Sequence, residues 1–341
     1  MTLELPIVQL ELRPGIIDLG WGHPDPGLLP VDDVRTAAVG ALDRFGADAL
    51  GYGFAAGAGP LRAWLRDRIA ANEGRSPSLD EIMITGGSSL GLDQVCTLLA
   101  EPGDVVLVES PTYHLAVRIL RDHPFELVPI PADAGGMRID ALEQAVAELA
   151  RQGRRPRMLY CVPTFHNPTG VSLSVERRRA LLDIAAREGF LVLEDDVYRE
   201  LAFDGPPPPS LWSMDSAGVV VRLGSFAKSL APGMRLGWLT GPAPLIAKIT
   251  GGGVLDSGGA ANHFTSIVVA QFCLNGSFER HVERLRNAYR KRRDALAAAL
   301  RETLPPGSDA TVPLGGFFTW VTLPEGVDTR ALLGSAEAHG V

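Results

Sequence analysis

Around its most unusual lysine the chain reads Gly224-Ser225-Phe226-Ala227-Lys228-Ser229-Leu230-Ala231-Pro232-Gly233-Met234-Arg235-Leu236-Gly237-Trp238, directly after the valine-rich run at residues 219–223. That run is typical of a buried strand. A lysine at the end of such a strand is costly to bury unless it is paired or neutral. Desolvation lowers its pKa, and the neutral amine is a nucleophile toward aldehydes. Lys228 is therefore a candidate for a Schiff base, although this motif alone also fits an exposed loop lysine.

Two further apolar runs also lead into polar residues. Residues 158–162 lead into Pro163-Thr164-Phe165-His166-Asn167-Pro168-Thr169-Gly170, and residues 191–194 lead into Asp195-Asp196-Val197-Tyr198. Each polar residue is ambiguous by itself, because Asn-Pro is a common turn, Asp often caps a helix and Tyr usually packs. Open α/β sheets, however, bind ligands outside the carboxyl ends of their strands. We therefore expect one crevice to bring together Asn167, Asp195, Tyr198 and Lys228.

The alternation of short β-rich runs with segments of helical period indicates the fold class. From about Asp80 onward, strands are predicted at residues 82–85, 105–109, 127–130, 158–162, 191–194 and 219–223. Helical periodicity lies between them, as at residues 139–146 and 178–185. Residues 105–108 are apolar on both faces, as in strands buried between two helical layers. The sequence predicts an α/β protein, a three-layer α/β/α sandwich with a mostly parallel central sheet.

The C-terminal part of the chain has a different pattern. A long helical region begins near Ala261 and reaches about Leu304, where Pro305-Pro306-Gly307 stops it, and residues 316–323 follow with a strand pattern. We predict a large domain over residues 30–250 and a smaller α+β domain built from residues 1–29 and 251–341. The arginine clusters at residues 177–179 and 290–293 are interleaved with acidic residues, and we expect them to be solvated helix faces.

Composition limits the class of function. The chain has 341 residues, 46% of them hydrophobic and 21% charged, which is enough for a large buried core. A formal net charge of -8 argues against general binding to nucleic acid or anionic membranes. Cys96, Cys161 and Cys273 lack any metal-ligand spacing, so we expect reduced core thiols and no metal site. No secretory signal is visible at Met1–Pro6 and no apolar run approaches the ~20 residues of a membrane span, so we expect a cytoplasmic location.

Taken together, the motifs resemble the fold-type-I pyridoxal-phosphate (PLP) enzymes, specifically the class I/II aminotransferases near the 2-aminoadipate and kynurenine aminotransferase branch. The resemblance covers nearly the whole chain. Besides the motifs above it rests on Gly22-His23-Pro24-Asp25-Pro26, Leu50-Gly51-Tyr52-Gly53, Gly59-Pro60-Leu61-Arg62, Thr85-Gly86-Gly87-Ser88-Ser89 and Glu109-Ser110-Pro111-Thr112-Tyr113. It implies a PLP-dependent transferase that moves the amino group of an α-amino acid to a 2-oxo acid through a Schiff base on Lys228.

The resemblance also implies a role for each matching residue. Lys228 would bind pyridoxal 5′-phosphate, Asp195 would pair with the protonated pyridine nitrogen, and Tyr198 would complete the catalytic set. Asn167 and Tyr198 would hydrogen-bond the phenolic oxygen, and Tyr113 would stack on the ring. The phosphate would be bound by Ser88, Ser89, Ser225 and Arg235. Tyr52 of the partner subunit would reach the same phosphate, which implies a homodimer with shared active sites.

The substrate side of the predicted site is less defined. Trp21, Gly22 and His23 lie in the segment that covers the substrate in this family, and Asn167 faces it, whereas a packed Trp and a loop His are the plainer interpretation. Family members bind the substrate carboxylate with a small-domain arginine that lies beyond the stretch matching residues 331–341. The sequence given stops at Val341, which leaves open a shortened chain or a different anchor. Ala227 stands where the branch usually has a serine.

Two other functions use the same residues. An enzyme of this fold could divert the carbanion to β- or γ-elimination, replacement or carbon–carbon bond formation, because the outcome depends on which substrate bond lies perpendicular to the ring. A PLP-binding sensor domain of a transcription regulator is a non-enzymatic alternative. Those regulators carry a helix-turn-helix domain before this fold, and the acidic chain argues against DNA. The expected partners are small amino acids and 2-oxo acids, with neither nucleic acid nor membrane.

Overall fold

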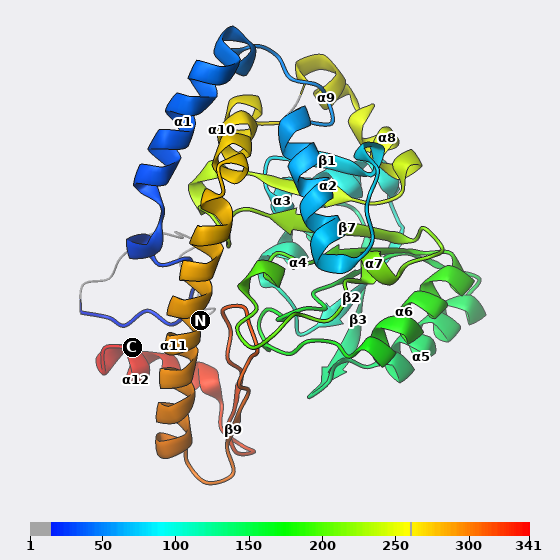
Figure 1. Cartoon of the computed structure of the whole chain (residues 1–341). Coiled ribbons are helices and arrows are strands. Elements are labelled where there is room, and N and C mark those ends of the chain that lie inside the picture. Colours follow the sequence, from blue (N-terminus) through cyan, green and yellow to red (C-terminus); the bar gives the residue numbers. More distant parts are fainter. Residues whose placement is uncertain (1–14, 260) are drawn as a thin grey trace.

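The computed structural model describes residues 15–259 and 261–341, and an eight-stranded sheet forms its centre (Figure 1). Five neighbouring strands run parallel, and the pairs β1–β8, β8–β7 and β3–β4 are antiparallel. The mostly parallel sheet of the predicted α/β class is confirmed. In spatial order the strands are β1 (Ile82–Thr85), β8 (Gly237–Thr240), β7 (Val220–Ser225), β6 (Leu191–Asp195), β5 (Pro156–Cys161), β2 (Val105–Ser110), β3 (Glu126–Asp133) and β4 (Gly136–Met137).

Helices cover both faces of the sheet, which explains why strands such as β2 are mostly apolar on both sides. One face packs against α3 (Ser88–Leu99), α4 (His114–Arg121) and α8 (Ala243–Thr250). The other face packs against α5 (Ile139–Arg151), α6 (Val175–Glu188) and α7 (Leu211–Met214). This is the predicted three-layer sandwich.

A third hydrophobic cluster joins the first helices of the chain to the later ones. It contains residues of α1 (Val31–Phe45), α2 (Gly59–Glu73) and α10 (His263–Leu274), packed around Phe226 and Trp238. Phe226 lies two residues before Lys228, so this cluster fixes the start of the segment that carries the lysine. The proposed division into domains at residues 30 and 250 stays a prediction.

The C-terminal part differs from the expectation at two points. The long helical region is two helices, α10 and α11 (Ser277–Thr303), because Gly276 adopts a left-handed conformation between them. The strand predicted at residues 316–323 is wrong for most of its length. Only β10 (Val321–Thr322) pairs, with β9 (Asp309–Ala310), while Gly316 has φ 75° and packs against Phe165. Figure 1 shows α12 (Thr329–Ala338) beside the long α11, with α9 (Gly253–Gly258) at the opposite end of the molecule.

The expectation of solvated arginine clusters is wrong at Arg178, whose side chain is fully buried. In α6 it lies three and four residues before Leu181 and Leu182, so the helical period places it on the buried stripe. Arg293 is also largely covered, by Asp204 and the carbonyl of Pro313. Arg179 is exposed, as expected for the cluster.

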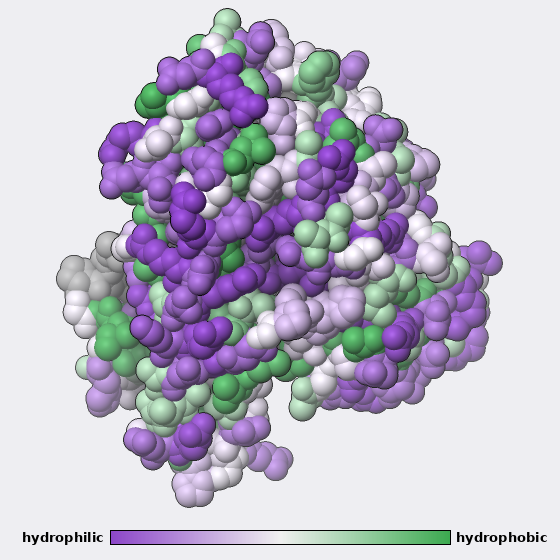
Figure 2. Space-filling model, viewed as in Figure 1, coloured by the Kyte–Doolittle hydropathy of each residue, from purple (hydrophilic) through white to green (hydrophobic). Residues whose placement is uncertain are grey.

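Burial of the three cysteines is confirmed, and none of them forms a disulfide. No helix in the described part of the chain is both long and apolar enough to cross a membrane. On the face shown in Figure 2, hydrophilic side chains predominate and hydrophobic ones are scattered among them. The Met1–Pro6 stretch lies outside the described residues.

Candidate active site

Lys228 lies just beyond the end of β7 and is partly buried. Its Nζ donates a hydrogen bond to the carbonyl oxygen of Gly22 at 2.7 Å, and it lies 5.9 Å and 5.8 Å from the ring centres of Tyr198 and Phe317. Burial lowers the pKa of Lys228 to about 8, although the carboxylate of Asp195 partly opposes this effect. A substantial fraction of this amine is therefore neutral near physiological pH.

Asp195 ends β6, the strand next to β7, and its side chain is buried. Burial raises its pKa to about 6, and the opposing influences include a hydrogen bond from Tyr160 and the charge of Lys228. The Tyr160 hydroxyl donates to Oδ2 at 2.6 Å, whereas Oδ1 is buried without a partner among the described residues. A buried carboxylate oxygen without a donor fits a ligand that brings an N–H group.

Tyr198 and Tyr113 lie within reach of the same carboxylate. Burial and the charge of Asp195 raise the pKa of Tyr198 well above its ordinary value, opposed by a side-chain hydrogen bond with Asn167. Burial and Asp195 also raise the pKa of Tyr113 to about 12, and Arg235 opposes that shift. The structure thus brings Asn167, Asp195, Tyr198 and Lys228 together, as the sequence predicts, with Tyr113 beside them.

The N-terminus of α3 forms an anion cradle at the edge of this crevice. Ser88 and Ser89 begin the helix, and no side chain caps its free N–H groups. A Cβ on Gly87 would lie 2.7 Å from Nη2 of Arg235, so the guanidinium approaches the backbone closely at this point. Ser225 ends β7 and pairs with Gly237 of β8. A Cβ on Gly237 would lie 3.0 Å from the backbone of Gly87 and Ser88, so this strand end also approaches the start of α3 closely. The three segments that carry the predicted phosphate ligands Ser88, Ser89, Ser225 and Arg235 therefore meet at this cradle.

The N-terminal segment covers Lys228 from the other side. The carbonyl oxygen of Gly22 accepts the hydrogen bond from Lys228 Nζ. A Cβ on Gly22 would lie 2.4 Å from the ring of Phe318, so only glycine fits here without movement. The rings of Trp21 and His23 stack at 5.7 Å. Burial and the charge of Lys228 lower the pKa of His23. Gly22 thus contacts the lysine directly, His23 lies close enough for the lysine charge to shift its pKa, and Trp21 stacks on His23.

Tyr52 is the exception among the predicted residues, because its side chain is 92% exposed. Within one chain the structure does not bring it into the crevice. This placement agrees with the expectation that Tyr52 acts on a second copy, but it does not test it.

Sequence reasoning missed Tyr160, Phe317 and Phe318. The rings of Phe317 and Phe318 meet Tyr198 edge-on at 5.7 Å and 5.9 Å. The signal for Tyr160 was a hydroxyl-bearing residue within the apolar run at residues 158–162, on the strand next to Asp195. No local pattern identified the two phenylalanines, because they belong to an irregular segment that resembled a strand.

Comparison with known proteins identifies relatives over nearly the whole chain. Residues 14–336 match the family model for aminotransferase class I and II. The aromatic-amino-acid aminotransferase 1 of Thermococcus litoralis is 36% identical, over 98% of this chain and 80% of the relative. Among solved structures, the kynurenine aminotransferase of Pyrococcus horikoshii, in complex with PMP, is 38% identical with a TM-score of 0.90, covering 96% of this chain and 80% of that one. The α-aminoadipate aminotransferase of Thermus thermophilus, complexed with N-(5′-phosphopyridoxyl)-L-leucine, is 32% identical with a TM-score of 0.85, covering 96% and 82%.

The lowered pKa of Lys228 predicts how fast the cofactor-free protein captures an added aldehyde. Only the neutral amine reacts, so the rate should rise with pH and level off above about pH 8. Borohydride trapping and peptide mass spectrometry would measure the adduct on Lys228. In Asp195→Asn the midpoint should move to lower pH, because the carboxylate that favours the ammonium is gone. A midpoint near the ordinary lysine value of 10.5 would contradict this assignment.

Proposed function

The chain belongs to the class I and II aminotransferase family and transfers amino groups with pyridoxal 5′-phosphate, and we propose that Lys228, Asp195 and Tyr198 are its catalytic residues. The observation that supports this most directly is a partly buried amine of lowered pKa just beyond the end of β7, beside a buried carboxylate at the end of β6. The carboxylate has an oxygen without a partner among the described residues.

The residues present fit the cofactor at three points. The unpartnered Oδ1 of Asp195 suits the N–H of a pyridinium ring, and the cradle of Ser88, Ser89 and Arg235 suits a phosphate. The Lys228 amine suits an aldehyde. When bound, pyridoxal phosphate supplies that aldehyde and a ring that accepts the electrons released at the substrate Cα. Ser225 would add a hydroxyl to the phosphate cradle, and Tyr113 an aromatic face against the ring.

The chain's own residues would then handle the protons. Lys228, with a pKa of about 8, can take a proton from the substrate Cα and return it, because both of its protonation states are populated near neutral pH. Asp195, with a pKa of about 6, is mostly ionised at neutral pH and can hold a cationic N–H close to it. Tyr198 stays protonated, because burial and Asp195 raise its pKa, so its hydroxyl serves as a hydrogen-bond donor.

The variant Lys228→Ala tests the catalytic assignment. It removes the nucleophile and the base but none of the proposed phosphate ligands, so cofactor should still bind while amino transfer falls by at least about 100-fold. Visible absorption of the bound cofactor and the yield of 2-oxo acid from an added amino acid measure the two effects separately. Lys248→Ala, at another lysine of the chain and outside the crevice, serves as the matched control. Transfer at the wild-type rate in Lys228→Ala would refute the proposal.

We propose an amino donor with an aromatic side chain. Aromatic rings lie near Lys228: the ring centres of Tyr198 and Phe317 are 5.9 Å and 5.8 Å from its Nζ, and Phe318 meets Tyr198 edge-on. The similarity to an aromatic-amino-acid aminotransferase supports the same class. Apolar walls favour a large apolar side chain through the area that both surfaces remove from water.

Replacing Phe318 by Ala tests the donor class. The kcat/KM for phenylalanine should fall by about 10- to 200-fold, as expected when a hydrophobic pocket loses its fit. Alanine provides the control within the same variant, because it reaches no aromatic wall and should react at nearly the wild-type kcat/KM. Equal losses for both donors would contradict an aromatic subsite at Phe318.

We propose that two copies of the chain form a homodimer that shares its active sites. Leu50, Tyr52 and Phe54 are 70%, 92% and 82% exposed. This segment lies against the end of α9, since a Cβ on Gly259 would meet the Gly53 carbonyl at 2.2 Å, and Val254 of α9 is 85% exposed as well. An exposed apolar patch of this kind is typical of an association surface. In a dimer, Tyr52 of the partner subunit would then be available to the phosphate cradle.

Mixing two damaged variants tests the shared site. A Lys228→Ala chain and a Tyr52→Ala chain together contain one intact site per mixed dimer, if lysine and tyrosine come from different copies. At cofactor concentrations where each variant alone is inactive, reassociation of equal amounts should restore about one quarter of the wild-type activity. Dimers without recovery would show that the tyrosine is not shared, and a monomer in sedimentation would exclude the dimer.

A further inference from the structure

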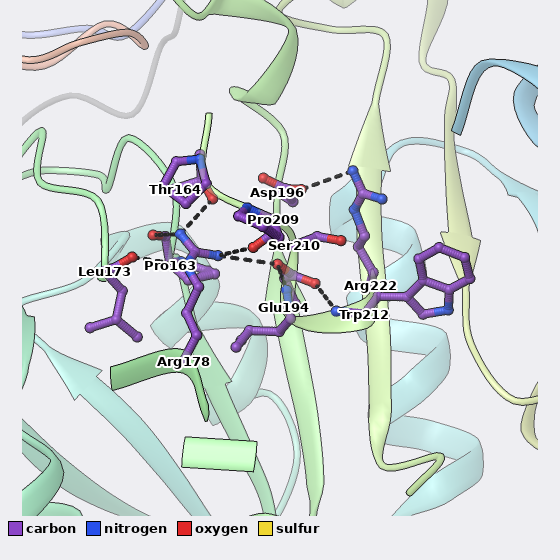
Figure 3. Close-up of polar contacts among 12 residues, drawn as sticks. Pro163, Thr164, Leu173, Arg178, Glu194, Asp196, Pro209, Ser210, Trp212 and Arg222 are labelled. Atoms are coloured by element: carbon purple, nitrogen blue, oxygen red, sulfur yellow. Dashed lines mark hydrogen bonds and ion pairs between the residues drawn. The ribbon is translucent and has the colours of Figure 1, made fainter. Parts of the chain in front are cut away.

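We propose that Arg178 is a positioning residue for amino transfer: it closes the loop that carries Asn167 and links this loop to the strand end that carries Asp195. The inference rests on the proposed role of Asn167 in binding the cofactor. Figure 3 shows the Arg178 guanidinium among the carbonyl oxygens of Pro163 and Leu173 and near the carboxylate of Glu194. Its side chain is fully buried, although it lies in an arginine cluster that resembles a solvated surface.

The Asn167 loop, residues 163–173, leaves the end of β5 and returns to the same place. The Leu173 N–H donates to the Pro163 carbonyl at 2.8 Å, which closes the loop at its base. Within the loop, His166 N–H donates to Val171 and Gly170 N–H to His166, at 2.9 Å and 2.7 Å. Asn167 therefore sits at the tip of a closed loop, and the position of its side chain depends on the base.

One guanidinium holds both sides of that base. Arg178 Nε donates to the Leu173 carbonyl at 2.8 Å, and Nη2 donates to the Pro163 carbonyl and to Thr164 Oγ1, the latter at 3.0 Å. The remaining nitrogen, Nη1, donates to the Pro209 carbonyl at 3.2 Å and lies 3.9 Å from Glu194 Oε1. The planar fork of arginine makes this set possible, because it directs five N–H donors at fixed angles.

The contact with Glu194 links the loop to the second catalytic strand. Glu194 precedes Asp195 in β6, and its two oxygens accept the N–H groups of Leu211 and Trp212 at 2.8 Å and 2.9 Å. Successive strand residues point to opposite faces, so Glu194 faces Arg178 while Asp195 faces the crevice. A shift at Glu194 would therefore move Asp195, and the same guanidinium sets Asn167 relative to it.

The variant Arg178→Lys tests the inference, because lysine keeps the charge but cannot supply the fork. Arg179→Lys, one residue later on the exposed side of α6, is the matched control. In the cofactor-free protein, amide hydrogen exchange of His166, Gly170 and Leu173 should accelerate in Arg178→Lys and not in Arg179→Lys. Exchange at the wild-type rate would overturn the inference and leave the proposed role of Asn167 in place.

The second readout is functional. In the loaded enzyme, Arg178→Lys should lower kcat by up to about 100-fold and move the pH midpoint of the cofactor's visible absorption in the same direction as Asn167→Ala. The combined variant should lose less kcat/KM than the product of the two single losses, because both act through one side chain. Independent, multiplicative losses would overturn the inference. An unchanged absorption midpoint in Asn167→Ala would instead refute the role of Asn167 and the link built on it.

A milder variant covers the case in which Arg178→Lys fails to fold. Thr164→Val keeps the shape of a fully buried side chain and removes one acceptor of the guanidinium. It should accelerate the same three amides less than Arg178→Lys would, and shift the absorption midpoint in the same direction. A Thr164→Val protein that matches the wild type in both measurements would refute the inference.

Discussion

The removal of an amine and a carboxylate from bulk water, side by side at two strand ends, is the constraint on which the rest of the site depends. Desolvation alone would favour the neutral form of each group, whereas the charge of each group favours the ionised form of the other. The pKa of Lys228 is about 8 and that of Asp195 about 6. Near neutral pH the lysine therefore populates both protonation states, and the acid is mostly ionised. A crevice open to water would return both pKa values toward their ordinary range, so the covering segment at Gly22 contributes to the chemistry.

The alternation of a single strand explains how three consecutive carboxylates are accommodated. Glu194, Asp195 and Asp196 could not all be buried on one side of the sheet without strong repulsion. The pleat directs Asp195 toward Tyr160, whereas Asp196 forms ion pairs with Arg222 at 2.9 Å and Arg199 at 2.5 Å on the opposite side. Strand geometry thus separates the acid proposed to act on the cofactor from acids that hold the scaffold.

How much of this could be predicted from the sequence depended on where a side chain finds its partners. Lys228, Asp195, Asn167 and Tyr198 follow parallel strands, so a one-dimensional pattern was enough to place them at one edge. Arg178 was misassigned, because its charge resembles that of Arg179 and its partners are loop carbonyl groups, 5, 15 and 31 residues away, that no sequence pattern marks as acceptors. The segment around Phe317 was misassigned for a related reason, since its aromatic and β-branched residues fit a strand, whereas Gly316 at its start turns the backbone.

The buried charges opposite the crevice also restrict which substitutions the site can accept. Arg222 contacts Glu73 at 2.6 Å as well as Asp196, and all three side chains are nearly inaccessible. Removing one member of such a group leaves an uncompensated buried charge, which typically costs about 3–5 kcal/mol. That loss is a large share of the stability of an ordinary domain. Asp196 directly follows Asp195, so the ion pairs among Glu73, Arg222 and Asp196 also stabilise the strand end that carries the reactive acid.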